Sequence, residues 1–167
     1  MMRVVSLRTP VIALLLALAA ACPAHAQEDA AEPPAVAAQA EPRTGSDWID
    51  ARLLDMNDYA ARYRDAFVDE IVRYHQAPRA LVEEALADEG MSAGDVYFAC
   101  ALAQAIGRPC RAVVDVWRSD SSDGWQGVAE RLDLDQLAGI HRRIRSDITE
   151  SYARWARPLD PGAPPTR

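Results

Sequence analysis

The sequence contains no lysine, so all 18 of its basic residues are arginines. They are outnumbered by 25 acidic residues, which gives a net charge of −7. Nucleic acids and anionic lipids bind to basic protein faces, so this balance argues against both as partners. Abundant alanine accompanies the missing lysine, and together they are typical of a GC-rich genome. We prefer that explanation to an arginine surface specialised for recognising ions.

Recognisable catalytic motifs are also absent. The sequence contains no Ser/His/Asp motif, no glycine-rich phosphate loop and no HExxH. Glu83 and Glu84 are adjacent on a predicted helix, so they point about 100° apart and do not face each other. Arg142, Arg143 and Arg145 alternate with acids and are typical of a solvated helix face. These absences favour a protein that is not an enzyme and that uses no cofactor.

The only long apolar run lies near the N-terminus, at residues 11–21. It is shorter than the about 20 residues that a membrane-spanning helix needs. Arg3 and Arg8 precede it, and small residues at positions 24 and 26 follow it, which is the pattern of a secretory signal cleaved after Ala26. We therefore expect residues 1–26 to be a signal peptide. No transmembrane segment is expected after cleavage.

Cys22 offers a rival interpretation of the N-terminus. It follows three alanines and could accept a lipid anchor, but the preferred leucine lies one place too early, at Leu18. We favour cleavage, which points to a periplasmic or secreted protein. Removal of the signal takes away two arginines and no acid, so the mature chain has 16 basic and 25 acidic residues and a net charge of −9.

Two segments are poor in large apolar residues. Residues 27–45 are rich in alanine, proline and glutamate, and residues 158–167 are rich in proline. Neither segment can bury enough surface to offset the entropy of ordering, so we expect a disordered linker and a short disordered tail. Residues 46–157 remain, which is enough for one modest domain with one core.

Helical spacing of apolar residues runs through 46–157, and it predicts an all-α bundle of five to seven short helices. The stripe over 49–74 is either one helix or two that meet at Met56–Asp58, and the pattern does not decide between them. Ser92–Asp95 matches a capping box, and Asp135 is expected to cap the last helix. The helix over 93–106 is apolar on every side, so we place it at the centre of the bundle.

Cys100 and Cys110 are the two cysteines that an exported form keeps, and they fit a disulfide, part of a metal site, or small apolar side chains. An oxidising compartment favours a disulfide. A helical hairpin places Cys100 about 10 Å along its axis from the turn and adds 8–10 Å between axes, beyond the about 7 Å that a disulfide spans. Zinc would need closer cysteines, or more ligands than His75 and His141 supply. We therefore predict two buried, unpaired cysteines.

Residues 119–130 resemble a calcium loop. Asp123, Gly124 and Glu130 match the fifth, sixth and twelfth positions of an EF-hand, whereas serine occupies the first and third. Two carboxylates are few for a hard cation. The alternative is a polar turn in which Asp123 caps a helix and Trp125 packs inward. Asp123 and Glu130 are therefore weak calcium candidates, and we predict no metal site.

Three packing motifs carry a resemblance over residues 67–134: "GDVYFACALAQAIGRP", "CRAVVDVW" and "GWQGVAERLDL". This region resembles a family of small exported bacterial proteins whose domain has no assigned activity. Gln126 and Asp133 stand where that pattern has glycine, and Cys110 where it has an ordinary apolar residue. The resemblance implies an all-helical exported domain and no ligand.

Export, the linker and the lack of catalytic motifs lead us to expect a non-enzymatic interaction or structural module of the bacterial envelope, with an unidentified envelope protein as partner. The alternative is an envelope enzyme, or a calcium- or redox-responsive protein.

Overall fold

Residues 41–159 are described by the computed structural model, and in this part of the chain the regular secondary structure is entirely helical. The predicted all-α bundle is thus confirmed. Its helices are α1 (Asp47–Arg62), α2 (Arg64–Tyr74), α3 (Arg79–Leu86), α4 (Ala93–Ala105), α5 (Cys110–Ser119), α6 (Gly124–Arg131) and α7 (Leu137–Arg154). The predicted signal peptide, Cys22, most of the linker and most of the tail lie outside the described residues.

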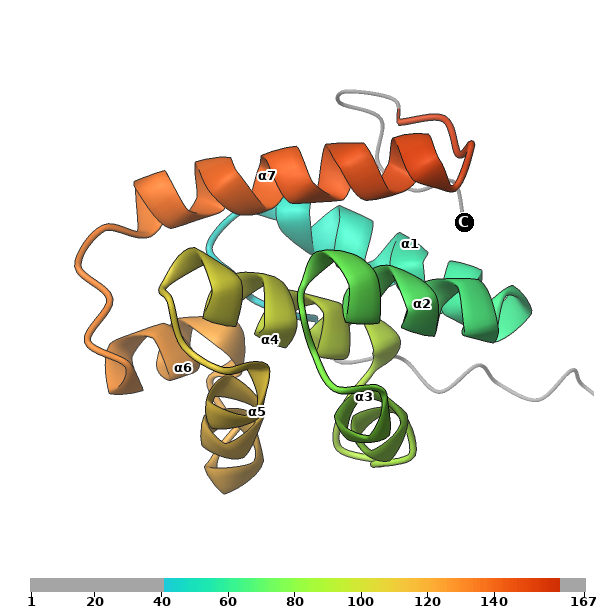
Figure 1. Ribbon diagram of the computed structural model, residues 1–167. Helices are drawn as coiled ribbons and strands as arrows, with labels where there is room; N and C mark the ends of the chain where they lie inside the picture. The colour runs from blue at the N-terminus through green and yellow to red at the C-terminus, as the bar shows by residue number, and fades with distance from the viewer. Residues whose placement is uncertain (1–40, 160–167) are drawn as a thin grey trace, which may run out of the picture. The chain divides into compact units, whose positions relative to one another are not determined.

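Helix α4 forms the centre of the bundle, as its all-round apolar surface predicts. Residues 94–103 are all buried, and α1, α3, α5 and α7 pack around them. The predicted capping box is present: Ser92 Oγ accepts from Asp95 N–H, and an Asp95 carboxylate oxygen accepts from Ser92 N–H. Figure 1 shows α4 in the middle of the bundle, with α7 along one side and α3 and α5 on the opposite side.

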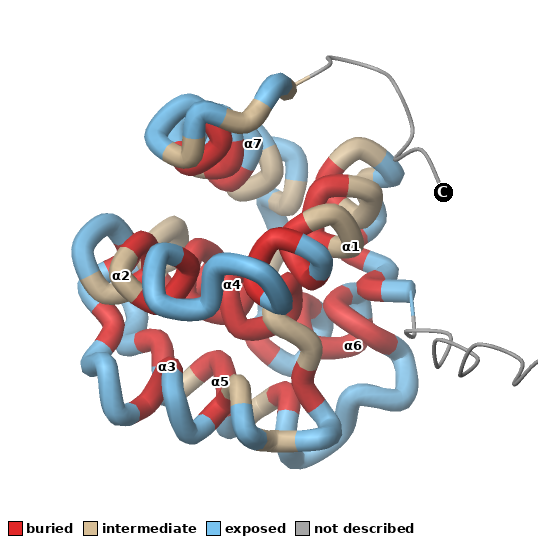
Figure 2. The backbone as a smooth tube through the Cα atoms, turned by 90° about the vertical axis from the view of Figure 1, so that its right-hand side faces the viewer, coloured by how far each residue is buried: buried red, intermediate tan, exposed pale blue. Residues whose placement is uncertain are grey.

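The outer helices turn one apolar stripe inward and leave their other faces to solvent. Figure 2 shows this division on α3 and α5, whose inner sides are buried and whose outer sides are exposed. Arg118 of α5 pairs with Glu84 and Asp88 across the two helices. Among the described residues no helix is both long and apolar enough for a membrane span.

The stripe over 49–74 forms two helices, and the break lies at Tyr63 rather than at Met56–Asp58. Asn57 stays inside α1 because its side-chain oxygen has a partner: it accepts the backbone N–H of Gly94 at 2.7 Å. A polar residue therefore need not end a helix when its side chain hydrogen-bonds to a neighbouring helix.

Residues 41–45 correct the expected end of the disordered linker. The Pro42 and Arg43 carbonyls accept the N–H groups of Trp125 and Gln126, each at 3.0 Å, and Thr44 is buried. These N–H groups belong to the first turn of α6, where a helix has no internal acceptors. Gly124 permits this approach: its φ is +62°, and a Cβ there would lie 2.7 Å from the Pro42 carbonyl oxygen.

The segment after α7 also packs more than expected. Arg157 forms an ion pair with Asp55 of α1, and Leu159, which lies within the predicted tail, packs against the core. Asp135 lies one residue before the actual N-cap of α7, Gln136, which makes no side-chain capping bond. The domain therefore begins before residue 46 and continues past residue 157.

Cys100 and Cys110 form a disulfide, so the prediction that they are unpaired is wrong. Their Cα atoms lie 4.5 Å apart. The predicted burial is correct, since the two residues are 1% and 7% exposed. The bond joins the middle of α4 to the first residue of α5.

Two features of the α4–α5 connection explain the error. The distance between helix axes overstates the distance between facing Cα atoms, because each Cα lies about 2.3 Å from its own axis. The connection also folds back beside α4: Gly107 adopts φ +70°, and Arg108 N–H donates to the Ala103 carbonyl. The chain therefore returns beside α4 before α5 begins, and this brings Cys110 next to Cys100.

Removing the disulfide should destabilise the domain. We expect the double variant Cys100→Ala/Cys110→Ala to lose about 2–3 kcal/mol of unfolding free energy, because the bond limits the unfolded chain and the loop it closes is short. Urea unfolding of the oxidised protein and of the variant measures this difference. Thiol titration of the oxidised protein, denatured without reductant, should find neither cysteine free; two reactive thiols in residues 27–167 would contradict the bond.

Candidate functional site

The loop that resembles a calcium site does not fold as one. Helix α6 begins at Gly124 and takes up the second half of the twelve-residue stretch, so Glu130 lies in the helix while Asp123 precedes it. Both side chains are exposed. Among the described residues, no three His, Cys, Asp or Glu side chains are grouped so as to hold a metal ion. The structure therefore does not bring the two calcium candidates into one site.

The polar-turn alternative is correct in part. Asp123 occupies the N-cap position of α6 but its side chain makes no capping bond, because the carbonyls of Pro42 and Arg43 supply the acceptors. Trp125 packs inward as predicted and is 1% exposed. Its indole N–H donates to the Asp95 carboxylate at 2.8 Å, and its ring stacks on Trp117 at 4.3 Å. Burial raises the pKa of Asp95, while the bonds from Ser92 and Trp125 oppose that rise.

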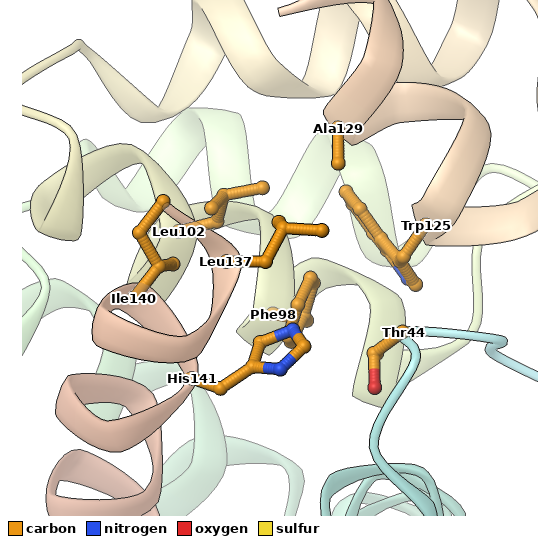
Figure 3. A pocket seen from close by; sticks show the side chains of 8 residues that line it. All are labelled: Thr44, Phe98, Leu102, Trp125, Ala129, Leu137, Ile140 and His141. Atoms are coloured by element: carbon orange, nitrogen blue, oxygen red, sulfur yellow. The ribbon is translucent and has the colours of Figure 1, made fainter. Parts of the chain in front are cut away.

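A small apolar cavity lies where α4, α6 and α7 meet residue 44. Figure 3 shows its eight lining side chains, with the His141 ring beside Phe98. The cavity volume is about 10 Å³, which is about the smallest space that holds one water molecule. Burial lowers the pKa of His141, so its ring favours the neutral form here. This cavity is a packing crevice and has no room for a substrate.

A network of buried polar side chains lies between α2, α4 and α7. Glu70 is 4% exposed and Ser151 is fully buried. Ser151 Oγ donates to Glu70 Oε1 at 2.7 Å and lies 2.8 Å from the Tyr97 hydroxyl, while Arg154 Nε donates to Glu70 at 2.9 Å. Desolvation strongly raises the pKa of Tyr97 and keeps its phenol protonated. The network joins the C-terminal half of α7 to α2 and α4.

His75 lies at the edge of this network. It is the C-cap residue of α2 and is only 5% exposed. Its Nδ1 lies 3.1 Å from Gln104 Oε1, which can only accept, so Nδ1 carries the hydrogen. Its Nε2 and Asp147 Oδ2 are buried without a hydrogen-bond partner among the described residues. Burial lowers the pKa of His75 and raises that of Asp147.

The network does not have the properties of a hydrolase site. A nucleophilic serine needs access to substrate and a base that takes its proton. Ser151 is sealed from solvent, and its hydroxyl hydrogen is directed to Glu70, which is itself held by Arg154. His75 makes no hydrogen bond to Ser151 among the described residues. The sequence pattern did not reveal this group, because Glu70 and Ser151 read as polar interruptions of apolar stripes.

No protein-family model, curated protein or solved structure matches the chain. The resemblance to exported bacterial proteins therefore stays a prediction.

Removing the charge of Glu70 should destabilise the domain far more than removing that of Glu150. Both contact Arg154, but Glu70 is buried whereas the Glu150 side chain is 63% exposed. We expect Glu70→Gln to cost about 2 kcal/mol or more, because it leaves a half-buried guanidinium without its partner. Glu150→Gln should change stability by less than about 0.5 kcal/mol. Denaturant unfolding compares the two variants, and equal effects would show that burial does not set the strength of these pairs.

Stability should fall as the pH drops below about 6.5, the usual pKa of histidine. Below this pH the unfolded chain binds a proton at His75, whereas the folded protein binds it only at a lower pH, because burial lowers the pKa of His75. Proton binding therefore favours the unfolded state, and the free energy of unfolding decreases. One group contributes at most about 1.4 kcal/mol per pH unit. Asp147 has a raised pKa, so its protonation at lower pH favours the folded state and opposes the effect of His75. Glu70 and Arg154 are the other charged groups that face His75.

Urea unfolding at pH 7.5, 6.5 and 5.5 measures this slope. His75→Gln should flatten it by more than His141→Gln, because His75 is the more deeply buried histidine. An unchanged slope in the His75→Gln protein would assign the loss of stability to other groups.

Proposed function

We propose that this protein is a non-enzymatic helical module of the bacterial envelope that acts by binding another protein. The disulfide between Cys100 and Cys110 supports an oxidising compartment such as the periplasm. The buried polar network of Glu70, Ser151 and Arg154 holds the helices together. The cavity in Figure 3 has no room for a metabolite. These features support binding through the outer surface.

The observation that carries this proposal is the junction of α1 and α2, residues 62–64. Tyr63 is 56% exposed and Tyr74 45%, and they are the two exposed large hydrophobic residues of the described domain. The Tyr74 ring is covered by the Arg154 guanidinium at 3.7 Å, so Tyr63 is the more available of the two. Arg62 and Arg64 flank it, and both are exposed. Tyrosine and arginine are the residue types that contribute most often to binding energy at protein interfaces. The junction therefore combines exposure with residues suited to contact a partner.

Affinity capture tests this function. The oxidised mature protein, residues 27–167, is immobilised and exposed to envelope extracts, in parallel with Tyr63→Ala and with Glu89→Ala, an exposed acidic control. We expect a protein captured by the wild type and by Glu89→Ala but lost with Tyr63→Ala. Repeated captures in which the wild type retains nothing beyond the bare matrix would overturn the proposal.

A further inference from the structure

A surface groove of about 200 Å³ opens beside the α1–α2 junction. One wall comes from α1, with Asn57, Ala60 and Ala61, and Arg64 of α2 lies next to it. The other wall comes from Leu86 at the end of α3 and from Ser92 and Ala93 at the start of α4. The lining mixes small apolar residues with the polar Asn57 and Ser92, and Arg64 is its only charged side chain.

Arg64 is exposed and lies where two helix ends meet. It begins α2, at the positive end of that dipole, but α1 ends two residues earlier, so the negative end of the α1 dipole adjoins it. Its guanidinium makes no ion pair or hydrogen bond within the described chain. Arg73, Arg79 and Arg118 each pair with carboxylates on neighbouring turns or helices. Other exposed arginines, such as Arg142, also have no ion pair among the described residues. Arg64 is set apart by its place in the lining of the groove, where its guanidinium is available to a bound partner.

We propose that this groove docks an acidic segment of the partner protein, with a carboxylate on Arg64 and a small aliphatic side chain between Ala60, Ala61 and Leu86. This inference rests on the proposed function and names the chemistry of the partner. The groove is smaller than the about 300–1,000 Å³ typical of small-molecule sites, but it accommodates one or two side chains. Tyr63, on the adjoining exposed surface, extends the contact beyond the groove.

Charge complementarity selects an acidic occupant. An unpaired guanidinium at the edge of the groove gains a charge-assisted hydrogen bond when a carboxylate arrives, and Arg62 adds a second cation two residues away. A basic segment would be repelled by both arginines. A neutral apolar segment would fill the groove but leave the guanidinium without a partner.

The test uses a random dodecapeptide display library selected on the oxidised mature protein. We expect the selected peptides to be enriched in Asp or Glu next to Ala, Val or Leu. Fluorescence anisotropy then compares the wild type with Arg64→Glu and with Arg142→Glu, a matched charge reversal at an exposed arginine of α7. Arg64→Glu should remain folded, because a carboxylate suits the first turn of α2.

Arg64→Glu should weaken binding of the selected peptides about tenfold or more, which corresponds to about 1.4 kcal/mol, and Arg142→Glu by less than about twofold. Selected peptides without acidic residues, or equal losses from the two variants, would overturn the groove assignment. If the captured envelope protein binds Arg64→Glu as well as the wild type, the interaction function stands and this groove is not its site. If acidic peptides bind the groove but no envelope protein is captured, the groove stands and the proposed function loses its support.

Discussion

A helix that is apolar on every side has to be covered on every side, and α4 imposes this requirement on the rest of the domain. Residues 94–103 are buried without interruption, so no face of the helix can be left to solvent. Four other helices supply apolar stripes to cover it. Gly94 lets α1 approach closely, because a Cβ there would lie 2.4 Å from the Leu53 carbonyl oxygen. The short helices α3 and α5 each cover part of the central helix, and the longer α1 and α7 cover other sides.

The covering helices were predictable because their signals are local. The spacing of Cys110, Val113, Val114 and Trp117 places them on one side of a helix, and all four are buried. The capping box of Ser92 and Asp95 involves two residues in one turn, and it too was predicted correctly. What the sequence pattern could not provide were contacts between residues far apart in the chain. The α6 cap supplied by Pro42 and Arg43 is such a contact, since the donors lie more than eighty residues away.

The disulfide shows that local sequence patterns can also miss contacts between residues close in the chain. Cys100 and Cys110 are ten residues apart, and their burial followed from periodicity, but their pairing depends on how residues 107–109 fold back beside α4. The expected Asp123 cap was wrong for a related reason: the first N–H groups of α6 donate to the carbonyls of Pro42 and Arg43 and not to the Asp123 side chain. In both places a backbone partner outside the motif decided the conformation.

Many polar residues of the described domain are used by the fold itself. Glu70, Ser151 and Arg154 interrupt apolar stripes, yet each is used within the network that attaches α7 to the bundle. The surface arginines of α3 and α5 are used similarly, since Arg79 and Arg118 bind carboxylates of the same domain. Arg64 shares with several other exposed arginines the lack of an ion pair among the described residues, but it lines the groove beside the junction of α1 and α2. The proposed contact with a partner is therefore centred on this arginine.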